Sequence, residues 1–200
     1  MTNRVEFLFD FGGPNSYLAY KMLPGLCART GAEIVYVPIL LGGLFKLTNN
    51  QAPMMRYAET PAKQKYEMLE FQRFVKAHGI PFNMNPRFPL NTLHVMRGAV
   101  AAQRLDCLVP YVDAVMTAMW HDTADLGDLN VVRDILDKAN LDSAALLALA
   151  EDPEVKAELM ANTEAAAKRG AFGVPTFFVG DEMFWGKERL GQVEAALTKS

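Results

Sequence analysis

The apolar positions at the start of the chain predict a strand, a helix and a second strand. Residues 5–11 form an apolar run suited to a buried strand, and residues 14–30 carry apolar side chains at helical spacing. After a break at Gly31, residues 32–39 predict another strand. Because a helix connects the two strands, we expect them to be parallel neighbours in a βαβ unit.

The middle of the chain, from about residue 43 to residue 169, has a helical apolar pattern. The pattern is divided by residues that break helices, namely Pro53, Pro61, Pro81, Pro86, Pro89, Pro110, Gly127 and Pro153. Asp142 and Asp152 have the positions of acidic N-caps at the start of two segments. We therefore expect residues 43–169 to be an all-helical insertion that divides a domain made of residues 1–42 and 170–200.

The end of the chain returns to strands. Residues 176–179 are rich in β-forming side chains, and a Gly180-Asp181 turn connects them to a further strand at residues 183–185. A last helix is predicted from about residue 188 to residue 199. Since the hairpin is antiparallel and the first pair of strands is parallel, the sequence predicts an α/β fold with a four-stranded mixed sheet and helices on both faces.

Composition narrows the class of protein mainly by exclusion. Two hundred residues, half of them apolar, suffice for one core, and a net charge of −3 without a basic run argues against nucleic-acid binding. No segment has the apolar length of a signal peptide or a membrane span, so we expect a cytoplasmic protein without a membrane partner. Cys27 and Cys107 are typical of buried free thiols, and the three histidines lack the spacing of metal ligands.

The segment Gly12-Gly13-Pro14 marks the turn from the first strand into the first helix. Proline is favoured at the first helical position, which makes Gly13 the residue immediately before the helix. A helix N-terminus carries partial positive charge and unpaired backbone donors, so it stabilises a thiolate, carboxylate or phosphate. The alternative is a βα turn in which glycine serves only the backbone angles.

A second motif, Gly173-Val174-Pro175-Thr176, directly precedes the third predicted strand. A cis bond before Pro175 would turn the backbone and expose the N–H and C=O groups of Val174. An exposed backbone of this kind can pair with an extended peptide. Together the two motifs predict a thiol-handling site that is assembled from both ends of the chain.

These motifs and their order resemble the thioredoxin superfamily, specifically the branch of kappa-class glutathione transferases and bacterial 2-hydroxychromene-2-carboxylate isomerases. The resemblance covers nearly the whole chain. Its further segments are residues 41–46, 49–53, 63–66, 79–81, 88–92 and 184–190. No single one of these motifs is decisive, but their joint order and spacing are specific.

The helix opens with the tetrapeptide Gly13-Pro14-Asn15-Ser16. Relatives that oxidise thiols have Cys-Pro-x-Cys there, so the resemblance excludes dithiol chemistry. Glutathione-using relatives usually have a serine first, whose hydroxyl bonds the glutathione sulfur; this chain has Gly13, and the lost hydrogen bond corresponds to about 1.5–3 kcal/mol. Ser16 is the nearest hydroxyl, a candidate thiol activator, although a serine at this spacing more often bonds a backbone carbonyl.

The resemblance implies glutathione as the cofactor and assigns residues to it. The backbone of Val174, before Pro175, would pair with the cysteinyl part, while Asn50 and Lys63 would contact glutathione. Glu188 stands where relatives usually have an aspartate that meets the γ-glutamyl group. Without the resemblance, Glu188 is equally well explained as a helix-dipole partner and Lys63 as part of a solvated helix face.

A small aromatic substrate is expected between the thioredoxin-like half and the helical insertion. The candidate substrate-binding residues are Phe45, Asn85, Phe88 and Asn91. Arg87 and Arg97 are possible partners for a substrate carboxylate. The alternative role of Phe88 is packing in the core. The alternative role of the two asparagines is to cap helices or form turns.

The sequence therefore predicts a glutathione-dependent cis–trans isomerase of the 2-hydroxychromene-2-carboxylate type, acting on aromatic keto acids from the breakdown of aromatic hydrocarbons. One alternative is a kappa-like glutathione transferase or peroxidase. Another is a glutathione-binding protein whose reactivity is weakened by Gly13. The resemblance also implies a homodimer.

Overall fold

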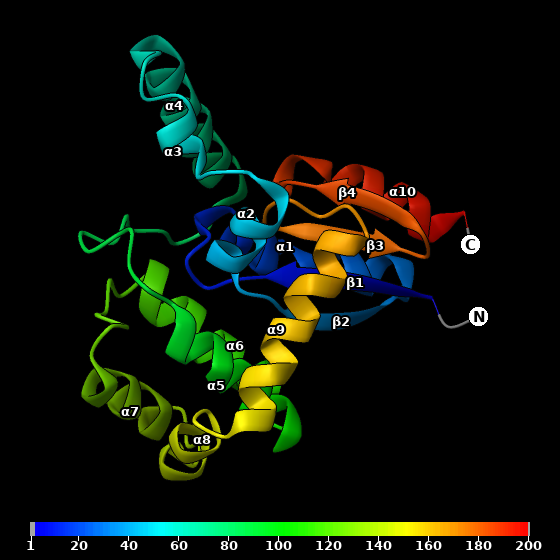
Figure 1. Cartoon of the computed structure of the whole chain (residues 1–200). Coiled ribbons are helices and arrows are strands. Elements are labelled where there is room, and N and C mark those ends of the chain that lie inside the picture. Colours follow the sequence, from blue (N-terminus) through cyan, green and yellow to red (C-terminus); the bar gives the residue numbers. More distant parts are fainter. Residues whose placement is uncertain (1–2, 200) are drawn as a thin grey trace.

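A four-stranded sheet is the framework of the computed structural model, which describes residues 3–199 (Figure 1). The strands are β1 (Arg4–Phe9), β2 (Glu33–Pro38), β3 (Thr176–Val179) and β4 (Glu182–Trp185), in the order β2-β1-β3-β4. β1 pairs with β2 in parallel and with β3 antiparallel, and β3 and β4 form an antiparallel hairpin. The predicted α/β class with a mixed four-stranded sheet is confirmed.

Helices cover both faces of this sheet. α1 (Pro14–Thr30) and α10 (Leu190–Thr198) pack on one face, and α2 (Leu41–Thr48) and α9 (Pro153–Lys168) pack on the other. A short 3₁₀ turn, η1 (Lys187–Arg189), precedes α10. The remaining helices are α3 (Pro53–Arg56), α4 (Pro61–His78), α5 (Leu93–Arg104), α6 (Leu108–Trp120), α7 (Leu129–Lys138) and α8 (Ser143–Leu149).

Strand β1 shows why its apolar run is buried on both sides. Phe7 and Phe9 belong to the large core that α1 and α10 share, whereas Leu8 packs with Leu44 of α2 and Phe178 of β3. Successive side chains of a strand point to opposite faces, so a strand between two helical layers needs apolar residues at nearly every position. The strand ends at Phe9 rather than at residue 11, because the next residues turn sharply.

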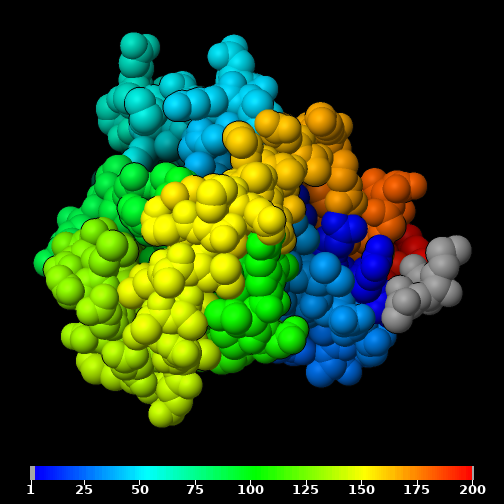
Figure 2. All heavy atoms as spheres, turned by 60° about the horizontal axis from the view of Figure 1, so that its bottom comes forward, coloured from blue at the N-terminus to red at the C-terminus, as the bar shows by residue number. Residues whose placement is uncertain are grey.

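The helices α5 to α8 gather on one side of the molecule. Figure 2 shows the green and yellow segments toward the left, with the blue and orange segments that contain the sheet strands toward the right. Trp120 and Leu136, from these helices, belong to the same apolar core as Phe7 of the sheet. The helical part is thus packed onto the sheet, whereas α3 and the start of α4 project away from it (Figure 1).

Local signals account for most helix starts, with two differences from expectation. Asp142 and Asp152 cap α8 and α9, accepting from Ala145 N at 3.0 Å and Glu154 N at 2.7 Å. Pro110 does not separate two helices but lies in the first turn of α6, where proline is tolerated. The last predicted helix is divided into η1 and α10 rather than continuous from residue 188.

Candidate functional site

The start of α1 is a helix terminus without a side-chain cap. Gly13 is the N-cap, with φ −95° and ψ 106°, and Pro14 is the first helical residue. The peptide bond between Val174 and Pro175 is cis, as predicted, and its loop lies against Gly13. A Cβ atom built on Gly13 would lie 3.0 Å from Val174 Cγ2. The structure therefore brings together the two motifs from opposite ends of the chain.

Asp10 fixes the turn that leads to this helix. Its carboxylate accepts three hydrogen bonds, from Gly12 N at 2.8 Å, Thr92 Oγ1 at 2.7 Å and Leu41 N at 2.8 Å. Burial raises the pKa of Asp10, although all three donors act to lower it. The sequence pattern predicted no role for Asp10. The signal was an acidic residue at the end of an apolar strand, directly before a glycine turn.

Phe11 connects the same turn to the helical part of the chain. Its carbonyl oxygen accepts a hydrogen bond from Trp120 Nε1 at 2.8 Å, and its N–H points to Met96 Sδ at 3.5 Å. Trp120 is fully buried and packs against the ring of Phe88, with centroids 5.5 Å apart. These contacts from α5 and α6 hold the strand-to-helix turn from the side of the helical part of the chain.

Ser16 does not make the backbone hydrogen bond expected of it. The residue is fully buried, and its Oγ has no hydrogen-bond partner within the described chain. A Cβ atom on Gly13 would lie 2.8 Å from this Oγ. The expected bond to a helix carbonyl is therefore wrong, and the hydroxyl instead lies beside the position of the missing Gly13 side chain. The neighbouring Tyr17 hydroxyl donates to Pro81 O at 2.6 Å.

The loop before Pro175 is braced by several side chains. Asn50 Nδ2 donates to Phe172 O at 2.8 Å, and the ring of Phe172 packs on Trp185 with centroids 4.9 Å apart. Trp185 also lies over Gly173, where an added Cβ would be 2.8 Å from its Nε1. Asn50 thus reaches the predicted glutathione loop, but its amide nitrogen is used to hold the backbone.

Glu188 is paired within the chain at the start of η1. It accepts a hydrogen bond from Lys187, whose buried ammonium lies 4.8 Å from the ring centroid of Phe74 on α4. Burial acts to raise the pKa of Glu188, but the hydrogen bond and charge of Lys187 outweigh it and hold that pKa below its usual range. Glu188 is therefore an anion whose charge is partly neutralised by its neighbour.

Lys63 and the two predicted asparagines are engaged by partners within the chain. Lys63 lies near the start of α4, with its ammonium 3.8 Å from the ring centroid of Tyr57. Asn85 is buried and donates to Met119 O at 3.1 Å and Ala124 O at 2.9 Å, so its amide group serves the fold. Asn91 accepts from Leu93 N at 2.9 Å as a local cap.

Phe45 is half-buried on α2, the helix whose first N–H is held by Asp10. The two candidate arginines are engaged at the surface of the helical part. Arg87 pairs with Asp125 at 2.9 Å and Arg97 with Glu151 at 3.6 Å. Phe45 lies about one helical turn after Leu41, the residue whose N–H is bonded to Asp10.

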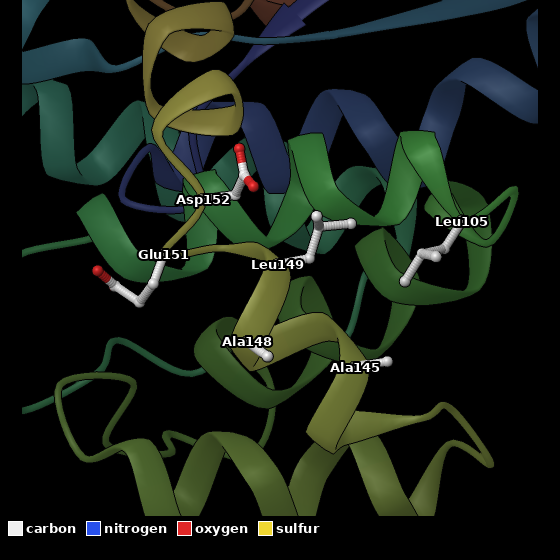
Figure 3. A pocket seen from close by; sticks show the side chains of 6 residues that line it. All are labelled: Leu105, Ala145, Ala148, Leu149, Glu151 and Asp152. Atoms are coloured by element: carbon white, nitrogen blue, oxygen red, sulfur yellow. The ribbon is translucent and has the colours of Figure 1, made fainter.

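Two surface cavities lie away from this site. One of about 560 Å³ is lined by residues around α8 that include Leu105, Leu149 and Glu151 (Figure 3). The other, of about 410 Å³, lies between α6 and α7 and includes Asp113 and Ile135.

Within residues 3–199 no helix is long and apolar enough to cross a membrane, and no cluster of three His, Cys, Asp or Glu side chains has a metal-ligand arrangement.

The thioredoxin-type sheet, the cis proline and the helix that begins beside it define a class of protein. The family model of the DSBA-like thioredoxin domain matches residues 4–198, and the chain belongs to this family. Within it, a 2-hydroxychromene-2-carboxylate isomerase of Sphingobium xenophagum is 32% identical over 197 residues, which cover 98% of this chain and 99% of the relative.

Two further comparisons agree with this placement. Glutathione S-transferase kappa 2 of Caenorhabditis elegans is 28% identical over 214 residues, covering 96% of this chain and 92% of the relative. A solved structure of a 2-hydroxychromene-2-carboxylate isomerase superposes with a TM-score of 0.86 at 29% identity, covering 98% of this chain and 95% of that one. The resemblance inferred from the sequence motifs is confirmed, and the named relatives of this chain are enzymes.

Proposed function

We propose that this protein is a glutathione-dependent isomerase of aromatic keto acids of the 2-hydroxychromene-2-carboxylate type. The observation that carries the proposal is the start of α1, which has no side-chain cap and lies against Val174, the residue before the cis proline. A helix terminus stabilises an anion, and an extended backbone next to it can hold a peptide thiol there. The isomerases among the relatives favour this reaction over other uses of a bound thiol.

In the proposed site the cysteinyl part of glutathione pairs with the backbone of Val174, beside Pro175. Asn50 contacts glutathione through its carbonyl oxygen, because its amide nitrogen is bonded to Phe172 O. Glu188 accepts a hydrogen bond from the ammonium of the γ-glutamyl group, because a carboxylate accepts several hydrogen bonds and Lys187 uses only one of them. Lys63 supplies a cation to a glutathione carboxylate and would have to be brought in from the projecting part of α4.

The proposed chemistry needs a thiolate and a site for an enolate. The sulfur attacks the conjugated double bond of the substrate, the C–S bond forms, and the electron pair of that double bond moves into an enolate. Rotation about the resulting single bond follows, after which the enolate returns its electrons and the C–S bond breaks. The partial positive charge at the N-terminus of α1 favours the thiolate, while Phe45, Phe88 and Asn91 form the substrate side.

The decisive experiment is an isomerase assay on the purified protein with 2-hydroxychromene-2-carboxylate. We expect conversion that requires glutathione and is lost when S-methylglutathione replaces it, because the blocked sulfur cannot add to the substrate. The measurement is the change in the ultraviolet spectrum as the ring-opened isomer forms. Absence of conversion at any glutathione concentration would contradict the proposal.

A parallel assay with chlorodinitrobenzene and with an organic hydroperoxide separates the alternatives. Consumption of either compound without isomerisation would assign the kappa-like transferase or peroxidase activity, which the Caenorhabditis elegans relative favours. Glutathione binding without any of the three reactions would assign a binding protein instead. Conversion of the chromene carboxylate assigns the isomerase. Each of the other two results, seen without that conversion, excludes the isomerase and assigns one of the alternatives.

We also propose that the protein forms a homodimer through the projecting α3–α4 segment. Large apolar side chains are exposed there, including Met54, Met55, Tyr66, Met68 and Leu69. Covering them with a second copy would remove apolar surface from water. Light scattering after gel filtration is expected to give twice the chain mass, and substituting Met55 and Tyr66 by lysine is expected to give the mass of one chain. A monomer in the unsubstituted protein would contradict this part of the proposal.

A further inference from the structure

The Ser16 hydroxyl is a buried polar group without a partner in the first turn of α1. The residue is fully buried, and Oγ finds no hydrogen bond within residues 3–199. Leaving such a group unpaired is unfavourable, so folded proteins rarely retain one without a use for it. The hydroxyl carries a proton to donate, which makes an anion a suitable partner.

The direction of this hydroxyl follows from its neighbours. A Cβ atom on Gly13 would lie 2.8 Å from Ser16 Oγ and 3.0 Å from Val174 Cγ2. Ser16 Oγ therefore lies close to the junction between the helix start and the loop of Val174. A side chain at position 13 would crowd the hydroxyl in this position, so the glycine is what leaves room for it.

Other polar side chains of the first turn are less suited to the role. Asn15 Oδ1 is also buried and unpaired, but an oxygen of this kind only accepts hydrogen bonds and cannot stabilise an anion. The Tyr17 hydroxyl is committed to Pro81 O. Ser16 is therefore the hydroxyl that remains available at this helix start.

We infer that Ser16 replaces the missing serine at position 13 and donates its hydroxyl hydrogen bond to the sulfur of the bound thiol. The inference rests on the proposed function and names the side chain that activates the thiol. On binding, the S–H bond breaks and its proton passes to solvent water, while the hydroxyl keeps its own proton and bonds the thiolate. Gly13 and Ser16 thus act as a pair in which the first makes room for the second.

The test is a pH titration of the thiolate absorbance of bound glutathione in the unsubstituted protein and in Ser16→Ala. We expect the unsubstituted protein to hold the thiol pKa below the value of about 8.5 for a free cysteine, and Ser16→Ala to raise it by about one to two units. The affinity for S-methylglutathione, which has no thiol proton, should stay within about twofold because the peptide contacts are unchanged.

A second variant separates loss of the hydroxyl from damage to the helix. In Gly13→Ser combined with Ser16→Ala, the new side chain no longer meets Ser16 Oγ and requires only a small shift of Val174 Cγ2, 3.0 Å from the new Cβ. It returns a hydroxyl to the usual position of the family. The bound-thiol pKa is expected to fall back by at least one unit. Ser143→Ala is the matched control, since Ser143 is another buried serine in the first turn of a helix, away from the site.

Three results would overturn the inference, and one of them also removes the proposed function. An unchanged thiol pKa in Ser16→Ala, with normal glutathione binding, would show that the hydroxyl does not touch the sulfur. A raised pKa that the double variant does not restore would show that Ser16→Ala acts through distortion. Failure of the unsubstituted protein to bind glutathione would contradict the proposed function together with the inference.

Discussion

Asp10→Ala is expected to lower the free energy of unfolding by about 3–5 kcal/mol, because several buried hydrogen bonds depend on this one carboxylate. The substitution leaves Gly12 N, Leu41 N and the Thr92 hydroxyl without their acceptor in the interior. Asp10 would no longer connect the turn before α1 to the starts of α2 and α5. Urea unfolding followed by circular dichroism measures the change.

Asp10→Asn is the matched variant for the same position. The amide keeps the volume and one acceptor oxygen for Gly12 N and Thr92, but its nitrogen would face Leu41 N as donor against donor. We therefore expect a smaller loss, about 1–3 kcal/mol. If Asp10→Ala were no more destabilising than Asp10→Asn, the carboxylate would not be the attachment point that its contacts indicate.

The stability difference between the unsubstituted protein and Asp10→Asn should depend on pH. Burial raises the folded-state pKa of Asp10 above its ordinary value of 3.8, so the folded state retains a proton that the unfolded state has already lost. The stabilising contribution of this linkage is fully present below that ordinary value and is lost as the pH rises through the folded pKa. As the pH falls, the free energy of unfolding of the unsubstituted protein should therefore rise relative to that of Asp10→Asn. A difference that does not change with pH would contradict a raised pKa of Asp10.

Much of the fold was predictable because it follows from local signals. The βαβ start, the hairpin at Gly180 and the acidic caps at Asp142 and Asp152 all depend on residues close together in the sequence. The position of Pro110 was misjudged because proline ends a helix in its interior but is tolerated in its first turn. The division between η1 and α10 has no comparably strong local signal.

The site was predictable only in part, because its geometry depends on contacts that are distant in the sequence. Gly13 and Val174 could be paired through their motifs, yet the sequence could not show that Asp10 would bond Leu41 and Thr92. The free hydroxyl of Ser16 was equally hidden, since helical spacing favours a backbone bond. The same limitation applies to Asn85, whose amide is used by two carbonyl groups far along the chain.

Gly98→Ala is expected to destabilise the protein by about 2–4 kcal/mol, although alanine usually favours a helix over glycine by about 1 kcal/mol. Gly98 lies in α5 where Tyr111 of α6 crosses it, and an added Cβ would overlap Tyr111 Oη and lie 2.8 Å from Cζ. Tyr111 is buried and donates to Val95 O at 2.9 Å, so it cannot move aside without losing that bond. Urea unfolding again provides the measurement.

The cause of this loss can be tested with Tyr111→Phe, which removes the overlapping oxygen. Alone, Tyr111→Phe should cost about 0.5–1.5 kcal/mol for the lost hydrogen bond. Combined with Gly98→Ala, the total should be smaller than the sum by at least about 1 kcal/mol, since the two substitutions share one contact. Gly25→Ala in α1 is the control, because that helical glycine is exposed and its nearest neighbour would be 3.7 Å away; it should leave stability unchanged or raise it. Additive losses in the double variant would show that the α5–α6 contact is not what requires Gly98.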